Sequence, residues 1–482
     1  MLMKKSVGFR SLCILPLSCV LLGLSSAGCR SVPVTSPILD SIPKHESVCE
    51  KAGIEPEWAQ VSSAWWHVFQ DPNLNALVES VLDGNSSLRA SWRRLEQSGY
   101  AARAVHSQRY PQLSLGVSSG WARRLQLPEG SLDNQEVWGA SAVASYELDV
   151  WRRVAAATEQ ADLLAQASYY DYDAMSISLA AAVCEAWFDV NERMLIVSLL
   201  RQQLVSSEST LAAVEERYRR GLGVLLDVYQ QRELVANVHA LIPGAEASVA
   251  LARSRLSVLL GGLPGESQAV GEGFLPPAPK PVDLDIDAFV AEDRPDVVAA
   301  LSRLSAAERG VALAQRDRFP VLKLTTSAGS QSDGADGLFD QVTGEAMLGL
   351  TLPLVDGGRR RAEVGRSQSL AAERLETYAE TVRQAMREIH DARVQERSQG
   401  ETVLRLQEEL AAATQTLELS TERYRGGLAD YLTVLTAQTR VQRLERTVIS
   451  AKRQQLSYRV QFCRALAGSD VEAVKRRMNS EQ

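Results

Sequence analysis

The chain has 482 residues, and 52 Lys and Arg side chains against 59 Asp and Glu side chains give a formal net charge of −7. No long basic stripe interrupts this balance, so a nucleic-acid partner is not expected. The hydrophobic share of 45% and aromatic share of 6% are typical of a folded chain, and exclude intrinsic disorder and a polytopic helical membrane protein. After the N-terminus no run reaches the roughly 18–20 apolar residues that a membrane-spanning helix needs.

The N-terminus has the pattern of an export signal. An apolar stretch runs from Leu12 to Leu24 and is followed by small residues. The basic residues that precede it are Lys4, Lys5 and Arg10. This pattern predicts a signal peptide over residues 1–28, too short to anchor the chain in a membrane.

Cys29 is the predicted first residue of the mature chain. It follows Ala27 and Gly28, and this resembles the cleavage site of bacterial lipoproteins, although that pattern prefers Leu where this chain has Ser26. Arg30, rather than Asp, resembles the sorting signal for the outer membrane. We therefore expect a covalent lipid such as palmitate on Cys29, with ordinary signal cleavage as the alternative, followed by an extended segment over 29–60.

Residues that could carry chemistry are scarce. The sequence shows no Ser-His-Asp order, no phosphate-binding loop and no metal-spaced cysteines, and its five histidines are scattered. Cys49, Cys184 and Cys463 are too sparse for a disulfide framework, and the last two are expected to be buried as small hydrophobic residues. An enzyme is not expected, and neither is a metal site.

The chain contains two copies of one pattern. The segment 216–222 (ERYRRGL) reappears as 422–428 (ERYRGGL), an offset of 206 residues. Upstream, 109–111 (RYP) matches 318–320 (RFP) at an offset of 209. The difference predicts a three-residue insertion in a loop between residue 111 and about residue 153.

The repeat sets the predicted domain boundaries. The first copy covers residues 61–262 and the second covers 293–468. A connector rich in Pro and Gly spans 263–292, and a tail follows over 469–482.

Each copy holds two stretches in which apolar and small polar residues alternate. They fall at about 112–148 in the first copy and about 321–354 in the second. In the first, Leu113, Leu115 and Val117 share one face, whereas Ser and Gly occupy the other. Strands of about 9–11 residues with one apolar face are typical of an outer-membrane barrel. An ordinary half-buried antiparallel sheet is the alternative.

Helices of unusual length make up the rest. Residues 154–220 contain no Gly or Pro, and a helix of this length would measure about 100 Å. In both copies apolar residues recur every three or four positions, which predicts coiled-coil packing. Pro243 and Gly244 interrupt the returning helix of the first copy, so a kink or break is expected there.

Four strands cannot close a membrane barrel, because single-chain barrels begin at eight strands. An open sheet edge cannot face lipid, because each unpaired backbone group would cost several kcal/mol. Three chains would supply twelve strands. We therefore predict a mixed α and transmembrane β fold in a homotrimer, whose 12-stranded barrel continues as a periplasmic α-helical barrel.

At this point the sequence resembles a known family. The segments that carry the resemblance are 65–74 (WWHVFQDPNL), 110–113 (YPQL), 146–151 (YELDVW), 294–297 (RPDV), 352–359 (LPLVDGGR) and both Arg-Tyr-x-x-Gly-Leu segments. Their order and their repetition resemble the outer-membrane efflux (TolC-like) family, most closely the lipoprotein branch that serves tripartite RND efflux systems. The resemblance covers nearly the whole mature chain.

The resemblance implies an outer-membrane exit duct that passively conducts drugs, metals or other small molecules. Its partners would be a periplasmic adaptor (membrane fusion) protein, an inner-membrane RND-type transporter and outer-membrane lipid. No cofactor is implied beyond the lipid on Cys29. The alternatives are the same duct serving type I protein secretion, and a lipid-anchored coiled-coil scaffold without a channel.

The resemblance also places a periplasmic gate at two helix-to-helix turns. The turn residues are Gly221, Leu222, Gly223, Asp227, Gly426, Gly427 and Leu428, with Arg219, Arg220 and Arg425 as charges that could latch neighbouring helices. Asp430 is the candidate for an acidic ring that favours cations, and Tyr431 is the candidate seal. The alternative for Asp430 is a helix cap.

Overall fold

The structure, a computed structural model, describes residues 64–126, 131–264, 273–279 and 293–467. The predicted signal peptide, Cys29, the segment 29–60, most of the connector and the tail lie outside the described residues. All of the described residues belong to one unit, Pro56–Gln482.

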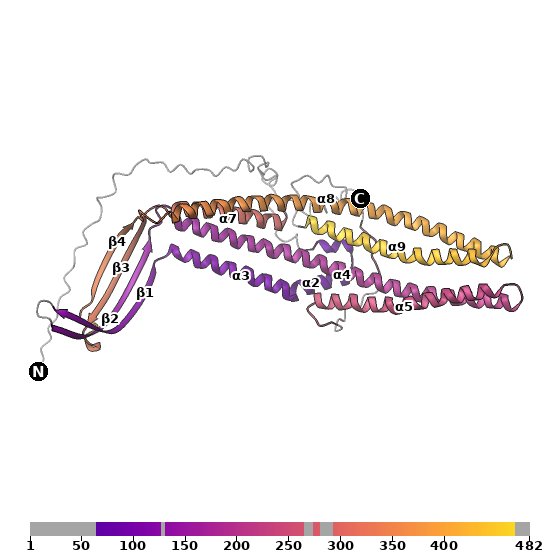
Figure 1. The fold of residues 1–482 in the computed structure, drawn as a ribbon, viewed down its shortest axis with the longest axis horizontal. Helices are drawn as coiled ribbons and strands as arrows, with labels where there is room; N and C mark the ends of the chain where they lie inside the picture. The colour runs from indigo at the N-terminus through magenta and orange to yellow at the C-terminus, as the bar shows by residue number, and fades with distance from the viewer. Residues whose placement is uncertain (1–63, 127–130, 265–272, 280–292, 468–482) are drawn as a thin grey trace, which may run out of the picture. The chain divides into compact units, whose positions relative to one another are not determined.

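The element order of this unit repeats (Figure 1). The first copy consists of η2 (Trp65–Phe69), α2 (Pro72–Gly84), α3 (Ser86–His106), η3 (Ser107–Arg109), β1 (Gln112–Gln126), β2 (Ser131–Glu147), α4 (Arg153–Arg219) and α5 (Leu225–Leu259). The second consists of α7 (Pro295–Arg316), β3 (Val321–Ser332), η4 (Ala335–Gly337), β4 (Thr343–Thr351), α8 (Arg359–Arg425) and α9 (Tyr431–Leu466).

The predicted insertion lies in the first β-hairpin region. The first residues of β1 and β3, Gln112 and Val321, are 209 positions apart, whereas those of α4 and α8, Arg153 and Arg359, are 206 apart. Both long helices have 67 residues. The change of offset therefore falls between the start of the hairpin and the start of the long helix, as expected.

Three of the strands are longer than the expected 9–11 residues. β1 and β2 have 15 and 17 residues, because they pair with each other beyond Trp138, where the pairing of β2 with β3 ends. β3 has 12 residues. β4 ends at Thr351, so the alternation that was expected to continue to Leu354 is not strand. Pro353 has no N–H to offer a ladder there.

The four strands form one antiparallel sheet in the order β1-β2-β3-β4. Its register brings the predicted apolar positions together on one face, since Leu115 pairs with Ala142 and Ala142 with Ala328, while Leu324 pairs with Leu348. Leu115 is 79% exposed and Leu348 is 61% exposed. A half-buried sheet would cover this apolar face with its own chain, and the described chain leaves it bare.

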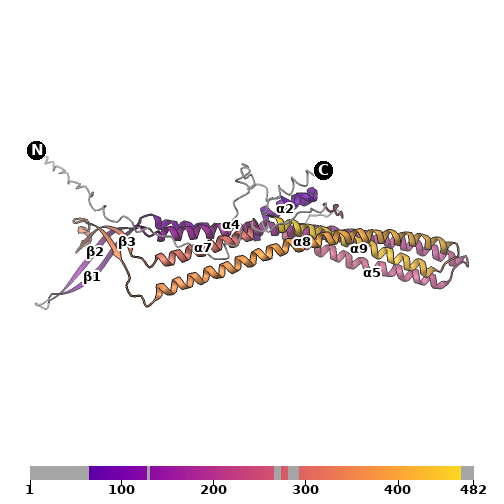
Figure 2. The ribbon, with the colours of Figure 1, turned by 90° about the horizontal axis from the view of Figure 1, so that it is seen from above.

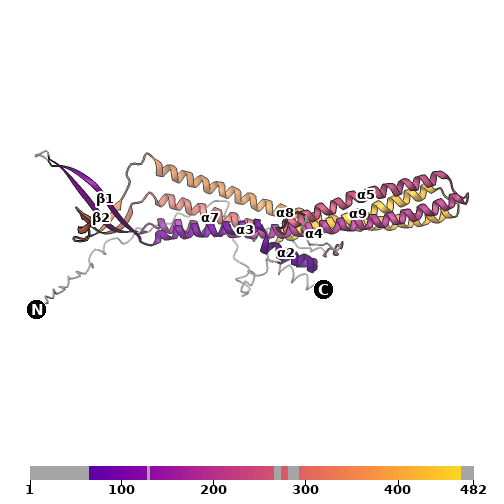
Figure 3. The same cartoon turned by 90° about the horizontal axis from the view of Figure 1, so that it is seen from below.

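The helices repeat the order of the strands in two rows (Figures 1 and 2). Next to the sheet, α4 packs between α3 and α7, and α7 packs against α8. Further from the sheet, α4 packs between α5 and α9, and α9 packs against α8 (Figure 3). The rows are thus α3-α4-α7-α8 and α5-α4-α9-α8. In each, the first copy supplies one free edge and the second copy supplies the other.

The main apolar core joins η2 and α2 to α4, α5 and α9. Phe69 packs edge-on against Phe188, with ring centroids 5.1 Å apart. Asp71 caps α2 by accepting from the amides of its second and third residues, 2.9 and 3.1 Å away, and also accepts from Trp187 Nε1 at 2.8 Å. Pro72 opens α2, where a missing N–H costs nothing. The FQDP motif therefore has two roles: Phe69 packs in the core, and Asp71 with Pro72 begins α2.

Both helical cysteines lie where the sequence predicts. Cys184 is fully buried in this core, and Cys463 packs against it. Burial raises the pKa of the Cys463 thiol to about 11.

The sequence predicts a kink or a break at Pro243, and the break is wrong. α5 continues through it from Leu225 to Leu259. Pro243 and His239 both lie on the exposed side of α5, so water can reach the His239 carbonyl that loses its helical hydrogen bond.

Of the described helices, only α5 is apolar enough to cross a membrane by composition alone, with a mean hydropathy of 1.4 over 18 residues. Its packing against α4 makes it an edge helix with an uncovered apolar side.

The bare apolar face of the sheet yields the first prediction. Leu115→Arg puts a charge on this face and should cost about 2–4 kcal/mol if the face meets lipid. We expect the native trimer in outer-membrane fractions to fall at least tenfold, measured by native gel electrophoresis. The control is Ser114→Arg, one residue away on the polar face, which should assemble normally. Equal loss in both variants would contradict a lipid-facing side.

Candidate functional site at the hairpin tips

Two helical hairpins, α4–α5 and α8–α9, end at the side of the unit away from the sheet (Figure 1). Gly221 and Gly427 occupy equivalent positions and have φ values of 74° and 75°. This left-handed conformation lets the amides of Leu222 and Leu428 bond back to carbonyls five residues earlier, at 2.9 and 2.8 Å. The repeated Gly-Leu pair is therefore the helix stop of both hairpins.

A set of three side chains connects the two tips, and we call it the tip link: Arg217, Asp227 and Tyr424. The Tyr424 hydroxyl donates to Asp227 Oδ2 at 3.1 Å. The Arg217 guanidinium lies 4.8 Å above the Tyr424 ring and donates to the Arg425 carbonyl at 3.0 Å. Burial, together with the bond to Asp227, raises the pKa of Tyr424. The first repeat thus holds the second by two hydrogen bonds and a cation–π contact.

Sequence reasoning found Asp227 but missed its partners. Tyr424 fits the apolar spacing of its helix, and nothing in the sequence separates Arg217 from the neighbouring Arg219 and Arg220. Arg219 and Arg220 instead pair with Glu216 on their own helix, at 3.1 and 2.6 Å. A signal was available, since a tyrosine in an otherwise aliphatic seam carries a hydroxyl that needs a partner.

Tyr431 lies inside the tip rather than on its surface. It is 2% exposed and packs in a cluster with Tyr424, Val214, Val228 and Val434. Its hydroxyl donates to Gln231, and burial is the main cause of its raised pKa. A sealing side chain has to reach the pore axis, so this position does not suit the seal expected of Tyr431.

Asp430 stands at the N-cap position of α9, yet its side chain makes no capping hydrogen bond. It is exposed beside Leu428, which is 72% exposed. The helix-cap alternative therefore lacks the contact that defines it. The carboxylate remains available to face a neighbouring copy.

Above the tip, the two repeats are joined by a buried polar seam: Gln203, Ser207, Gln231, Gln438 and Gln442. All five residues are at most 6% exposed. Within the first repeat, Gln231 Nε2 donates to the Ser207 carbonyl at 2.7 Å. Between the repeats, Gln442 Nε2 donates to Ser207 Oγ at 3.0 Å. Gln203 Nε2 donates to the Gln442 carbonyl at 3.0 Å. Each such bond contributes about 1 kcal/mol, and a buried partner left unpaired costs about 1–3 kcal/mol.

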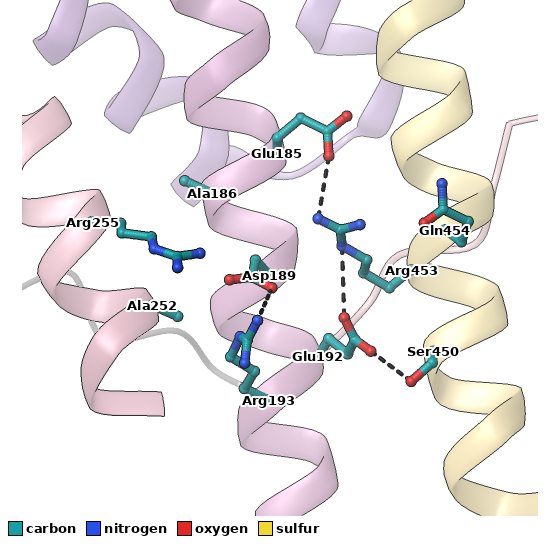
Figure 4. A pocket seen from close by; sticks show the side chains of 10 residues that line it. All are labelled: Glu185, Ala186, Asp189, Glu192, Arg193, Ala252, Arg255, Ser450, Arg453 and Gln454. Carbon is teal, nitrogen blue, oxygen red and sulfur yellow. Dashed lines mark hydrogen bonds and ion pairs between the residues drawn. The ribbon is translucent and has the colours of Figure 1, made fainter. Parts of the chain in front are cut away.

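A groove of about 530 Å³ lies between α4, α5 and α9 (Figure 4). Asp189 pairs with Arg193 at 2.9 Å, and Arg453 lies 3.4 Å from Glu185 and 3.6 Å from Glu192. The carboxylates on this face of α4 are thus matched by guanidiniums. In the described part of the chain no group of His, Cys, Asp and Glu side chains has a metal-binding arrangement.

Large apolar side chains are exposed on both tips. Those with at least 58% exposure are Leu222, Val224, Leu226, Tyr229, Leu428 and Leu432. Exposed apolar groups gathered in one place are typical of a protein-binding surface.

Known proteins share this architecture. Outer membrane protein OprJ of Pseudomonas aeruginosa is 28% identical over 469 residues, which cover 94% of this chain and 95% of that protein. The toluene efflux pump outer membrane protein TtgF of Pseudomonas putida is 28% identical over 465 residues, covering 93% and 96%.

Solved structures agree. The outer-membrane channel OprN matches with a TM-score of 0.79 and 25% identity, covering 84% of this chain and 92% of that chain. VceC of Vibrio cholerae matches with a TM-score of 0.77 and 25% identity, covering 84% and 98%. The fold class expected from the sequence, a TolC-like trimeric channel of two tandem repeats, is confirmed.

The family model described as outer membrane efflux protein matches residues 77–262 and 290–468. These residues contain the sheet, both long helices and both tips. The chain belongs to the outer membrane efflux protein family and is an outer-membrane efflux duct.

Proposed function

We propose that this duct is the exit of a tripartite pump, which receives small molecules from an inner-membrane RND-type transporter through a periplasmic adaptor. The sheet carries the proposal: among the described residues nothing covers its apolar face or pairs with its two edges, and the helical rows follow the same strand order. Three chains joined edge to edge would close sheet and helices at once. A scaffold without a channel does not account for the apolar sheet face.

The cargo would be chosen upstream of the duct. Relatives of similar identity carry names that refer to toluene and to pyoverdine, which are chemically unlike. A passive duct would conduct drugs, metals or other small molecules as its transporter supplies them. The exposed apolar residues of both tips suit the adaptor.

The gate would lie at the tips. In this proposal the tip link and the buried polar seam hold α8–α9 against α4–α5 in the closed duct, and opening separates the hairpins. Three Asp430 carboxylates around the axis would favour cations.

A lipid on Cys29 would tether the chain to the same membrane. The bond from Trp187 to Asp71 fixes α2 at a level about 34 residues along α4 from Arg153, which is about 51 Å from the sheet end of that helix. The 35 residue-to-residue steps from Cys29 to Ala64 can span at most about 115–125 Å. The tether is therefore long enough to reach the level of the sheet.

Single-channel conductance of the full chain in planar bilayers tests the duct and its acidic ring. We expect small, cation-selective openings, and Asp430→Ala should make them larger or less selective, because a ring of three charges is lost. Divalent cations should block the wild type more strongly than the variant. If conductance and selectivity do not respond to Asp430→Ala, the acidic-ring proposal is contradicted and the duct function stands. No conductance from verified trimers would overturn the open-duct function.

The tip link predicts a second conductance change. Asp227→Ala removes the acceptor of the Tyr424 hydroxyl, so the open fraction should rise about fivefold, the equivalent of one hydrogen bond of about 1 kcal/mol. Tyr424→Phe should act in the same direction. The control is Arg220→Ala, because Arg220 pairs only within α4 among the described contacts. A rise of equal size in the control would rule out the link.

The lipid anchor is tested by metabolic labelling with palmitate. Label should appear on the wild type and be absent from Cys29→Ala, with Cys49→Ala as the labelled control. An unlabelled wild type would favour ordinary signal cleavage.

A further inference from the structure

At all four places where the chain passes between helix and strand, large apolar side chains lie exposed. Tyr110 precedes β1 and is 69% exposed, and Leu354 and Val355 follow β4 at 86% and 92%. Trp151 and Phe319, from the other two connections, stack with centroids 5.3 Å apart and stay 41% and 48% exposed. These connections therefore form an apolar and aromatic rim under the sheet.

Arginines stand next to this rim on its helix side. We call them the junction arginines: Arg109, Arg152, Arg318, Arg359 and Arg361. All are exposed in the chain. An exposed aromatic residue directly adjoins an arginine at three of the connections, and at the fourth Arg359 follows Val355 by four positions.

The carboxylates at the same level are largely engaged. Asp149 accepts from the amides of the first residues of α4 at 3.0 and 2.8 Å, and Glu147 pairs with Arg153 at 2.7 Å. Asp317 and Asp356 both lie against Arg360, at 3.3 and 3.6 Å.

The charge count leaves a surplus. The four connecting segments, 107–111, 147–153, 316–320 and 352–361, contain eight arginines and four carboxylates, and Glu159, just outside them, pairs with Arg152 at 3.7 Å. Arg318, Arg359 and Arg361 form no ion pair with the described residues. Because an exposed positive surplus needs counter-charge, this level of the duct should attract anions.

We propose that the junction arginines bind the phosphate groups of anionic phospholipids in the leaflet on the helix side of the sheet. Aromatic side chains favour the membrane interface, and a guanidinium matches a phosphate with two parallel hydrogen bonds. The rim continues the apolar face of the strands. The phosphate groups of the lipids should therefore lie next to the rim on its helix side, where the junction arginines are. The inference rests on the outer-membrane location of the duct. It places the membrane boundary on the helix side of the sheet at the four connections.

The test compares lipid retention by purified full-length trimers in mixed micelles of phosphatidylethanolamine with phosphatidylglycerol. Arg318→Gln, Arg359→Gln and Arg361→Gln are combined in one variant. The control combines Arg387→Gln, Arg397→Gln and Arg405→Gln, further along α8. Retained phosphatidylglycerol per trimer, counted by native mass spectrometry, should fall at least tenfold in the junction variant, since one arginine near an anionic surface contributes about fivefold. The control should match the wild type.

Two further arms separate charge from folding and lipid from free phosphate. The Arg→Lys version of the junction variant keeps the charge and should retain most of the lipid, so its retention assigns the loss to charge even if the Gln version assembles less. Inorganic phosphate at the same concentration should not displace the lipid. Unchanged retention in the Gln variant, equal loss in the control, or displacement by inorganic phosphate would overturn the proposal. Normal conductance with no lipid preference would leave the duct intact and remove this inference alone.

Discussion

The unpaired edges of the four-stranded sheet are the constraint on which the rest of the structure depends. β1 and β4 each present a row of backbone N–H and C=O groups, and in lipid those groups must find partners on another strand. A neighbouring copy can supply them only if β1 of one chain meets β4 of the next. The order of the helices in each row then follows from the order of the strands, because each strand is joined to a helix of the row next to the sheet. Each has first-copy helices at one free edge and α8 at the other, so one rotation about the axis closes the sheet and both rows together.

Equal helix length follows from the same constraint. Near the sheet α4 runs beside α3 and α7, and towards the tips it runs beside α5 and α9, whereas α8 runs beside α7 and then beside α9. A residue added to one of the two long helices would therefore displace its tip from the other. Both have 67 residues, and the three extra residues of the first copy fall in the hairpin region before α4. A hairpin loop absorbs an insertion at little cost because it packs against few neighbours. The two copies therefore keep equal lengths in the long helices, which pack along their whole length, and differ in length only in the hairpin region.

Features that depend on local chain geometry were predictable. A period of two places Leu115 and Leu348 on one sheet face, and Gly at equivalent positions marks the two turns because each requires a positive φ. Features that depend on which helices meet were not. Tyr424 and Tyr431 fit the apolar period equally well, yet one bonds across the hairpins and the other fills the tip core. A search for apolar repeats passes over Gln203 and Ser207, although both are buried as deeply as the leucines beside them. Pro243 is tolerated because α5 is an edge helix, a position that the sequence of α5 does not reveal.

The chemistry of the contacts differs within and between the hairpins. Leu200, Leu234 and Val238 hold α4 to α5, and Ala413, Val441 and Leu444 hold α8 to α9, so each hairpin has an apolar interior of its own. Between the hairpins, above the tip, the seam is hydrogen-bonded instead: Gln442 donates to Ser207 Oγ, and Gln203 donates to the Gln442 carbonyl. An apolar interface tolerates many registers, whereas buried amides must meet particular partners or lose about 1–3 kcal/mol each. The seam therefore fixes one register of α9 on α4, and it does so with bonds that can be exchanged for others one helical turn away. Gln438, one turn from Gln442, already lies 3.4 Å from the same Ser207 Oγ. At the tip the division is incomplete, because Val214 and Val228 of the first hairpin share one apolar cluster with Tyr424, Tyr431 and Val434 of the second. Hydrogen bonds therefore set the register of the two hairpins above the tip, and apolar packing joins them at their ends.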